Sequence, residues 1–318
     1  MKPDLPFDAA VEAIERADKL VLACHVSPDG DALGSMLGFA ASATAAGRRV
    51  WASFGRPFRV ADNYRFLPLD LLSPPEEVPE DPDVMVVFDV ASPDRLGDLA
   101  RVADHAGKLI VVDHHRSNTG FDGVLLVDPE AAATAEVAVA LIDRLGWQLT
   151  EEAAVSFYTA LVTDTGRFQY SNTGAATLRL AARLVEAGAR PHVIGRHLYE
   201  EAPFGFLKVA ARVLDRARLE GRMVWSVVTA DDLEAHGIGW EDTDPLIDLV
   251  RVAKEAEVAV LLKVPEPGVV KVSLRSRGGV DVGSIAAALG GGGHHNAAGA
   301  TVSGSPEQVV AQIGRLHG

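Results

Sequence analysis

Short apolar runs alternate with longer, helix-like stretches through the first half of the chain, and this alternation limits the folds that it can adopt. LVLAC, VMVVF and LIVV are such runs, and GDALGSMLGFAASATAAG and AAATAEVAVALIDRLG are such stretches. Uninterrupted Val, Leu and Ile segments are typical of strands in a parallel sheet, because crossover helices bury both of its faces. From residue 20 to about residue 187, the sequence therefore predicts an α/β domain with a doubly wound, mainly parallel sheet.

The pattern changes beyond the middle of the chain. Residues 189–203 mix Gly, Pro and polar residues, leave room for a short helix over 192–199, and are interpreted as a linker. The strand-like segments MVWSVVT, VAVLLKV and VVKVSLRS then precede the helix-like DVGSIAAALG, a glycine run and a closing helix. We therefore predict a first domain over 1–188 and a smaller α+β domain over 204–318.

The charge of the chain restricts its partners. The net charge is −14, from 30 Lys and Arg against 44 Asp and Glu. A surface of this sign repels the evenly spaced phosphates of long nucleic acid, which disfavours an extended duplex as a partner. A small anionic substrate can still bind where metal ions, Arg or His are concentrated.

The N-terminal sequence and the single cysteine bear on location. MKPDLPFDAAVEAIERADKL has neither the charged flank and apolar stretch of a signal peptide nor the roughly twenty apolar residues of a membrane span. Cys24 lies inside the apolar run LVLAC, where a buried, inert thiol is expected, and it has no second cysteine for an internal disulfide. We therefore expect a cytoplasmic protein without a membrane partner.

Acidic and histidine residues follow several of the predicted strands and one helix of the first half. They are His25, Asp29, Asp31, Asp89, Asp113, His114, His115 and Asp164. Taken singly, each has a structural interpretation: Asp31 can cap the helix that follows it, and adjacent histidines can be a satisfied, partly buried pair. The carboxyl ends of parallel strands share one edge of a sheet, however, and ligands bind in the crevice outside them. We therefore expect these segments to converge.

Carboxylate and imidazole ligands without thiolates suit a divalent metal of intermediate hardness. Mn²⁺ is favoured over Mg²⁺ because histidines are present, with Co²⁺ or Zn²⁺ as substitutes. The number of candidate ligands exceeds what one closed tetrahedral zinc site needs. The residues therefore predict two metal ions that share a carboxylate, an arrangement suited to attack on phosphorus.

These residues resemble the motifs of the DHH phosphoesterases, whose name comes from a triplet like Asp113-His114-His115. The resemblance is closest to the nanoRNase type, bifunctional oligoribonucleases that also remove the 3′-phosphate of 3′-phosphoadenosine 5′-phosphate. It covers almost the whole chain. The N-terminal motifs occur in the family's order: His25-x-x-x-Asp29-x-Asp31, Asp89, the DHH triplet and Asp164-Thr-Gly.

The second half resembles the DHH-associated domain. The matching strings are Ser273-Leu-Arg275-Ser-Arg277, Asp281-Val and Gly290-Gly-Gly-Gly-His294-His295-Asn-Ala-Ala-Gly299. A glycine run alone is usually a flexible turn, but this longer string suits a backbone that a nucleotide phosphate or base approaches closely. The resemblance also implies a cleft between the two domains.

The resemblance implies a role for each matching residue of the first half. One ion is expected to bind His25, Asp29 and Asp89. The other is expected to bind Asp31, Asp89, His114 and Asp164, so that Asp89 bridges the two ions. As further catalytic residues, His115 is expected to touch the scissile phosphate and Asp113 to orient a histidine.

The second half is expected to bind substrate phosphate across the cleft. The resemblance assigns this role to Arg275, Arg277 and His294, with backbone amides from Gly291, Gly292 and Gly293. Arg167, which follows the Asp-Thr-Gly turn, is a further candidate, and a solvent-facing role is the alternative.

The resemblance implies a homodimeric enzyme that hydrolyses dimers to pentamers of RNA to nucleoside 5′-monophosphates and converts 3′-phosphoadenosine 5′-phosphate to AMP. A cyclic di-AMP or pApA phosphodiesterase stays open as an alternative. So does a non-catalytic nucleotide-binding regulator, although the loss of metal ligands expected of one is not seen in this sequence. A manganese pyrophosphatase is not expected to carry the GGGGH string, and a RecJ-type exonuclease is expected to be longer.

Overall fold

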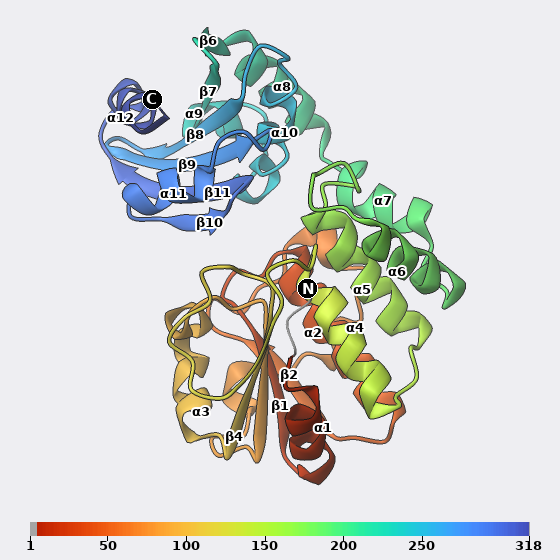
Figure 1. Cartoon of the computed structure of the whole chain (residues 1–318). Helices are drawn as coiled ribbons and strands as arrows, with labels where there is room; N and C mark the ends of the chain where they lie inside the picture. Colours follow the sequence, from red (N-terminus) through yellow and green to blue (C-terminus); the bar gives the residue numbers. More distant parts are fainter. Residues whose placement is uncertain (1–4, 318) are drawn as a thin grey trace. The chain divides into compact units, whose positions relative to one another are not determined.

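The structure is a computed structural model that describes residues 5–317. The chain divides into two compact units between Glu200 and Glu201, and each is described by itself (Figure 1). Among the described residues, none of the helices combines the length and the apolar character needed to cross a bilayer.

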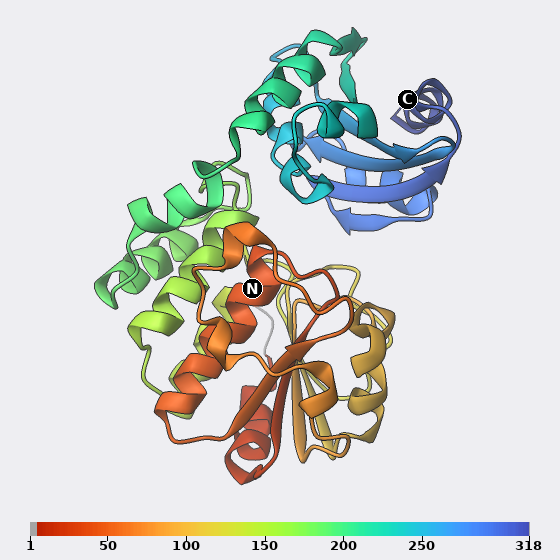
Figure 2. The same cartoon turned by 180° about the vertical axis from the view of Figure 1, so that it is seen from behind.

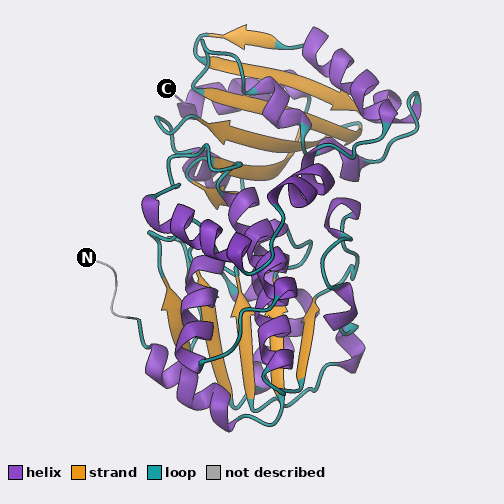
Figure 3. Cartoon of the chain, turned by 90° about the vertical axis from the view of Figure 1, so that its right-hand side faces the viewer, coloured by secondary structure: helices purple, strands orange, loops and turns teal. Residues whose placement is uncertain are grey.

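A parallel sheet forms the centre of the first unit, as the apolar runs predicted. Over the described residues of this unit, the strand order is β2-β1-β3-β4-β5, and each neighbouring pair is parallel. The arrowheads of these strands accordingly point to the same end of the sheet (Figure 3). The strands are β1 (Leu20–Cys24), β2 (Val50–Phe54), β3 (Val84–Phe88), β4 (Lys108–Asp113) and β5 (Val124–Val127).

Helical segments cover both faces of this sheet, because alternate residues of each strand point to opposite sides. Leu22 of β1 lies in the core cluster that includes α1, α2, α4 and α5, whereas Val21 lies in the cluster that includes η4 and α3. Figures 1 and 2 show α3 on the face of the sheet opposite α2. These helical segments are α1 (Phe7–Arg16), α2 (Gly30–Ala45), η4 (Pro93–Leu99), α3 (Ala100–His105), α4 (Thr134–Leu145) and α5 (Glu151–Asp164). Three short 3₁₀ segments separate β2 from β3: η1 (Asp62–Tyr64), η2 (Leu69–Leu71) and η3 (Pro75–Glu77).

Helices α2 and α5 pack closely along glycines of α2. Gly30, Gly34 and Gly38 are four residues apart, so they lie on one face of the helix. A Cβ atom at Gly34 would lie 2.4 Å from the backbone oxygen of Ser156, and one at Gly30 would lie 2.5 Å from the hydroxyl of Thr163. The missing side chains let the backbones approach, which places the first turn of α2 beside the last turn of α5.

The segment expected as a linker is largely part of the first unit. Helices α6 (Ala175–Glu186) and α7 (Pro191–Tyr199) close this unit. Ile194 and Leu198 of α7 are buried in the same core cluster as α2 and α5. The short helix allowed over 192–199 is thus present as α7, and two of its nine residues are buried.

The second unit is built on a mixed sheet. Over its described residues, the strand order is β10-β11-β9-β8-β7-β6, in which β7 and β8 are parallel and the other pairs are antiparallel. The strands are β6 (Arg218–Glu220), β7 (Met223–Thr229), β8 (Val258–Glu266), β9 (Val269–Ser276), β10 (Gly292–His294) and β11 (Ala297–Ser303). With its flanking helices, this sheet matches the smaller α+β domain that the sequence predicted.

Helices cover both faces of the mixed sheet. Val260 of β8 lies in the core cluster with α11 and α12, whereas Leu261 lies in the cluster with α8, α9 and α10. The helical segments are α8 (Phe204–Asp215), α9 (Ala230–Glu234), η5 (Trp240–Thr243), α10 (Leu246–Val250), α11 (Val282–Ala288) and α12 (Pro306–His317).

Asp232 ties α9 to α8 within the second unit. Its buried carboxylate accepts hydrogen bonds from the backbone N–H and the hydroxyl of Thr229, both at 3.0 Å, and pairs with Arg212 and Arg216 of α8. Burial alone raises the pKa of Asp232, but the hydrogen bonds from Arg216, Thr229 and Arg212 outweigh it and hold this pKa well below its usual range.

Asp232→Asn is expected to destabilise the protein at neutral pH and to do so by a smaller amount in acid. A carboxylate whose pKa is lowered by folding stabilises the fold above its unfolded pKa of about 4, and this contribution is lost as the pH falls towards the folded pKa. The expected loss near neutral pH is about 2 kcal/mol of unfolding free energy. Urea unfolding near pH 7 and near pH 3 measures it. Asp231→Asn, at an exposed neighbour in α9, is the control; an equal deficit at both pH values would contradict the prediction.

Candidate active site

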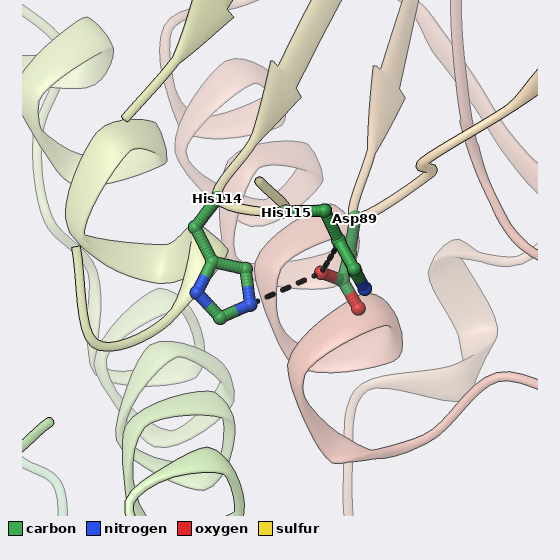
Figure 4. Close-up of side chains that lie close together, drawn as sticks. All are labelled: Asp89, His114 and His115. Atoms are coloured by element: carbon green, nitrogen blue, oxygen red, sulfur yellow. Dashed lines mark ion pairs between the residues drawn. The ribbon is translucent and has the colours of Figure 1, made fainter. Parts of the chain in front are cut away.

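Polar residues at the carboxyl ends of the parallel strands gather at one edge of the first unit's sheet. His25 directly follows β1, Asp89 directly follows β3, and Asp113 is the last residue of β4. Since these strands are parallel, their carboxyl ends lie at the same edge. His114 and His115 continue the chain from β4 at that edge (Figure 4).

Asp89 lies at the centre of the cluster. Its Oδ2 atom is 3.7 Å from Nε2 of His25, whereas its Oδ1 atom is 3.6 Å from Nε2 of His114 and 3.5 Å from Nδ1 of His115 (Figure 4). The two oxygens of one carboxylate therefore face different histidines. The backbone of Asp89 has a left-handed φ of 58°, a conformation that is uncommon outside glycine and that collects at functional sites.

The side chains form three overlapping groups that could each hold a metal ion. Within each group, one ligand atom per residue lies within 4.8 Å of the others. The groups are His25, Asp29 and Asp89; Asp31, His114 and Asp164; and Asp89, His114 and His115. Because Asp89 and His114 each belong to two groups, the residues form one continuous cluster.

The first turn of α2 supplies Asp29 and Asp31. The Oδ1 atom of Asp29 accepts the backbone N–H groups of Asp31 and Ala32, both at 3.1 Å. Asp29 is therefore the N-cap of this helix. The capping role considered for Asp31 falls to Asp29, and Asp31 instead turns its buried carboxylate towards His114, with 3.5 Å between Oδ2 and Nε2.

Asp164 enters the cluster from the end of α5. Its Oδ2 atom is 3.3 Å from Nε2 of His114. A carboxylate at the C-terminal end of a helix meets the negative end of the helix dipole, so local structure gives no reason for an aspartate there. Burial first, and then the charges of Asp89 and Asp29, raise the pKa of Asp164 to about 7 against the opposing effect of His114.

The histidines show that the cluster carries excess negative charge. Burial lowers the pKa of His25, but Asp29 and Asp89 outweigh it and raise this pKa to about 10. Burial likewise opposes a charged His114, yet Asp164, Asp31 and Asp89 raise its pKa to about 10. A site that favours positive charge so strongly on its imidazoles also favours a bound cation.

The donor set fits a divalent metal. It consists of carboxylate oxygens and imidazole nitrogens, which suit Mn²⁺, Mg²⁺, Co²⁺ or Zn²⁺. Cys24, next to His25 in sequence, is fully buried in the core cluster with α2, and burial raises the pKa of its thiol. The acidic and histidine side chains at the sheet edge can therefore hold a metal ion.

Asp113 holds His115 and is itself held by Asn118. One oxygen of the fully buried Asp113 carboxylate is 2.7 Å from Nδ1 of His115 and accepts the backbone N–H of His114 at 2.8 Å. Its other oxygen accepts Nδ2–H of Asn118 at 2.6 Å, and the same amide donates to the backbone oxygen of Val90 at 3.0 Å. Sequence reading missed Asn118, although its place three residues after His115 is a local signal.

Asn118→Leu is expected to lower the unfolding free energy by about 2 kcal/mol, because the buried Asp113 oxygen loses its side-chain donor while the side-chain volume changes little. Urea unfolding of the metal-free protein measures the loss. Asn63→Leu makes the same change at an exposed position and is the matched control. Equal stabilities of the two variants would show that the Asn118 amide does not support Asp113.

Arg275 lies in the second unit's sheet between strands β8 and β11. It is half-buried in β9, and its Nη1 atom donates to the backbone oxygen of Leu274 at 3.0 Å. On β11, Ala297 pairs with Arg275 and Gly299 pairs with Ser273.

The glycine run of the second unit has two structural roles. A Cβ atom at Gly291 would lie 2.1 Å from the backbone oxygen of Gly299, and one at Gly293 would lie 2.5 Å from Cα of Ala298. At these positions, the close approach is to the neighbouring strand β11. At Gly292, by contrast, an added Cβ would meet nothing within 4 Å. This position can admit a ligand.

Arg277 and Arg167 each have a partner within their own unit. The guanidinium group of Arg277 donates to the backbone oxygen of Val252 at 3.2 Å, which ties it to the turn after α10. Arg167 lies 3.8 Å from the ring centroid of Tyr199, in a cation–π contact. The side chain of His294 lies outside the described part of the structure.

The chain is similar to known proteins over most of its length. Residues 19–163 match the DHH family N-terminal domain, and residues 223–313 match the DHHA1 domain. A bifunctional oligoribonuclease and PAP phosphatase NrnA of Thermus thermophilus is 36% identical over 90% of this chain and 84% of that protein. A cyclic-di-AMP phosphodiesterase GdpP of Geobacillus thermodenitrificans is 27% identical over 92% of this chain and 46% of that protein.

A solved structure shows a similar fold over nearly the whole chain. The crystal structure of an exopolyphosphatase-related protein from Bacteroides fragilis has a TM-score of 0.88 and 26% identity, and the match covers 97% of this chain and 94% of that chain. The two domain matches and the relative from Thermus thermophilus show that the chain belongs to the DHH phosphoesterase family. The chain is therefore a hydrolase.

Proposed function

We propose that the protein hydrolyses dimers to pentamers of RNA to nucleoside 5′-monophosphates and dephosphorylates 3′-phosphoadenosine 5′-phosphate to AMP. The observation that carries this proposal is the position of Asp89, whose two oxygens face His25 on one side and His114 on the other. The name of the relative from Thermus thermophilus, an oligoribonuclease and PAP phosphatase, supports the choice of substrates.

Two divalent ions, with Mn²⁺ preferred, would bind this cluster. His25, Asp29 and Asp89 would hold one ion, and Asp31, Asp89, His114 and Asp164 would hold the other. Bound there, the ions would place positive charge beside the phosphate and make water a better nucleophile near neutral pH. The raised pKa of Asp164 and of the histidines supports cation binding at this position.

The chain's own residues would orient the phosphate. His115 would donate a hydrogen bond from Nε2 to a phosphate oxygen in its protonated form, which the Asp113 carboxylate at Nδ1 favours by raising the pKa of the ring. Asp113 would thereby set the direction of the imidazole ring and favour its charged form. In the second unit, Arg275 and the backbone N–H of Gly292 would bind a further phosphate; the space where a side chain of residue 292 would lie supports the choice of Gly292.

A substrate panel tests the proposal. The purified protein is incubated with Mn²⁺ and, separately, with a diribonucleotide, a pentaribonucleotide, 3′-phosphoadenosine 5′-phosphate, pApA and cyclic di-AMP, and products are separated by chromatography over time. We expect Mn²⁺-dependent release of nucleoside 5′-monophosphates and of AMP. Removal of metal with a chelator is expected to stop turnover, and Mn²⁺ is expected to restore it. If none of the substrates is hydrolysed, the result favours the alternative of a non-catalytic nucleotide-binding regulator.

A cyclic di-AMP phosphodiesterase is the second candidate function, and the similarity to the GdpP of Geobacillus thermodenitrificans favours it. The same panel distinguishes the two candidate functions. A cyclic di-AMP phosphodiesterase would consume cyclic di-AMP or pApA faster than the diribonucleotide. We also propose that the protein is cytoplasmic and forms a homodimer. Size-exclusion chromatography with light scattering tests the homodimer.

Arg275→Ala is expected to raise KM for a diribonucleotide by about 10- to 100-fold and to change kcat less, because it removes a charged hydrogen bond to a phosphate that does not react. Steady-state kinetics with saturating Mn²⁺ measures both constants. Arg315→Ala, at an exposed position of α12, is the control. A fall in kcat at an unchanged KM would place Arg275 at the reacting phosphate instead.

A further inference from the structure

Helix α4 begins beside the cluster of acidic and histidine residues, and the residue before it has no side chain that could cap it. The residue before the helix is Ala133, whose side chain cannot accept a hydrogen bond. The free N–H groups of the first turn need acceptors from elsewhere. Asp31 provides them: its Oδ2 atom accepts the N–H of Thr134 at 2.7 Å, and its Oδ1 atom accepts the N–H of Ala135 at 3.3 Å.

The side chain of Thr134 contacts a second carboxylate of the cluster. Thr134 is fully buried, and its hydroxyl donates to Oδ1 of Asp89 at 2.9 Å. One residue thus bonds Asp31 through its backbone and Asp89 through its side chain. These are carboxylates from α2 and from the end of β3, far apart in the sequence.

The hydroxyl of Thr134 restricts the rotation of the Asp89 carboxylate about its terminal torsion. The terminal torsion of an aspartate is broad, so the direction of its two oxygens depends on external contacts. The hydrogen bond holds Oδ1 on the side of Thr134, where His114 and His115 lie, and this leaves Oδ2 directed at His25. The division of the two oxygens between two sides of the cluster therefore depends on this hydroxyl.

We propose that Thr134 is a positioning residue for metal binding, which sets the Asp89 carboxylate in its bridging orientation and fixes Asp31 beside it. The proposal rests on the proposed function, because it presumes that Asp89 is shared between two ions. Ser35 supports the same arrangement, since its hydroxyl donates to Oδ1 of Asp31 at 2.9 Å. Residues that orient metal ligands typically change metal affinity by about 10- to 100-fold when they are replaced.

Thr134→Val and Thr134→Ser separate the hydroxyl from the rest of the side chain. Valine keeps the shape of threonine but removes the hydroxyl, and the backbone N–H groups of residues 134 and 135 can still donate to Asp31. Serine keeps the hydroxyl. We expect Thr134→Val to weaken Mn²⁺ binding by about 10- to 100-fold and Thr134→Ser to bind as the unmodified protein does. Isothermal titration calorimetry of the metal-free full-length protein with MnCl₂ measures the affinity without any substrate.

Thr159→Val is the matched control. Thr159 is also fully buried in the first unit, but its hydroxyl donates to the backbone oxygen of Val155 in its own helix. Urea unfolding in a chelator compares the variants without metal. If Thr134→Val and Thr159→Val lose similar stability and both keep the Mn²⁺ affinity of the unmodified protein, Thr134 has a structural role only and the proposal is wrong.

Two further results are decisive. If Thr134→Val does not fold, Thr134→Ala takes its place, because alanine removes the hydroxyl without setting a methyl group against the Asp89 carboxylate; the same loss of affinity is expected. If the unmodified protein binds no Mn²⁺, the proposed function fails and this inference fails with it. Normal binding by the unmodified protein and by Thr134→Ala would overturn the inference alone.

Discussion

Asp89→Asn is expected to lower kcat for diribonucleotide hydrolysis by at least about three orders of magnitude, which corresponds to ~4 kcal/mol of transition-state stabilisation. The substitution preserves the size of the side chain but removes its charge, and an amide offers one oxygen where a shared carboxylate offers two. Asparagine also tolerates the left-handed backbone that residue 89 adopts. The loss is therefore expected without unfolding, as circular dichroism can verify.

The matched control for this prediction is Asp143→Asn. Asp143 lies in α4, is half-exposed and pairs with Arg183 at the surface. Its substitution is expected to leave kcat unchanged, since exposed ion pairs contribute little and this one lies outside the cluster of acidic and histidine residues. Mn²⁺ titration accompanies the kinetics. If the Asp89→Asn protein keeps its turnover and its Mn²⁺ stoichiometry, Asp89 is not a metal ligand and the prediction is wrong.

Gly34→Ala is expected to destabilise the protein by about 3 kcal/mol, because overpacking a close contact forces backbones apart. The new Cβ atom would lie 2.4 Å from the backbone oxygen of Ser156 and 3.0 Å from the backbone nitrogen of Ala160, and neither can rotate away. Separation of α2 from α5 would also move Asp31 away from Asp164. We therefore expect weaker Mn²⁺ binding in addition to a lower urea midpoint.

Gly195→Ala provides the control for Gly34→Ala. Gly195 lies inside α7, and an added Cβ atom there would meet nothing within 4 Å. Alanine is favoured over glycine inside a helix, so this substitution is expected to stabilise the protein by roughly 0.5–1 kcal/mol. Opposite changes at the two positions would identify contact with α5, and not the loss of glycine itself, as the cause. Similar changes would rule out that explanation.

The sheet of the first unit could be predicted because its signal is local. Runs such as LVLAC are buried over their whole length, and both faces of the sheet are covered as expected. Helix α7 matches the short helix allowed over 192–199, but a helix of nine residues with two buried positions gives little local sign that it packs on the first unit. The close packing of Gly34 against Ser156 depends on a tertiary contact that no local pattern contains.

The acidic and histidine residues could be identified from sequence, because each follows the end of a predicted strand or helix. The residues that hold them could not. The backbone N–H of Thr134 reaches Asp31 across 103 positions, and its hydroxyl reaches Asp89 across 45. For Thr134, the local sign was Ala133, because an alanine before a helix cannot cap it with its side chain.

The double use of two aspartates affects the choice of an inactive protein for capturing a substrate complex. Asp29 caps α2 and Asp31 caps α4, so an alanine at either position would weaken a helix cap as well as remove a proposed metal ligand. A complex trapped in such a mutant would report a rearranged pocket. Asp164 ends its helix without capping another, so Asp164→Asn offers the more faithful template for soaking or co-crystallisation.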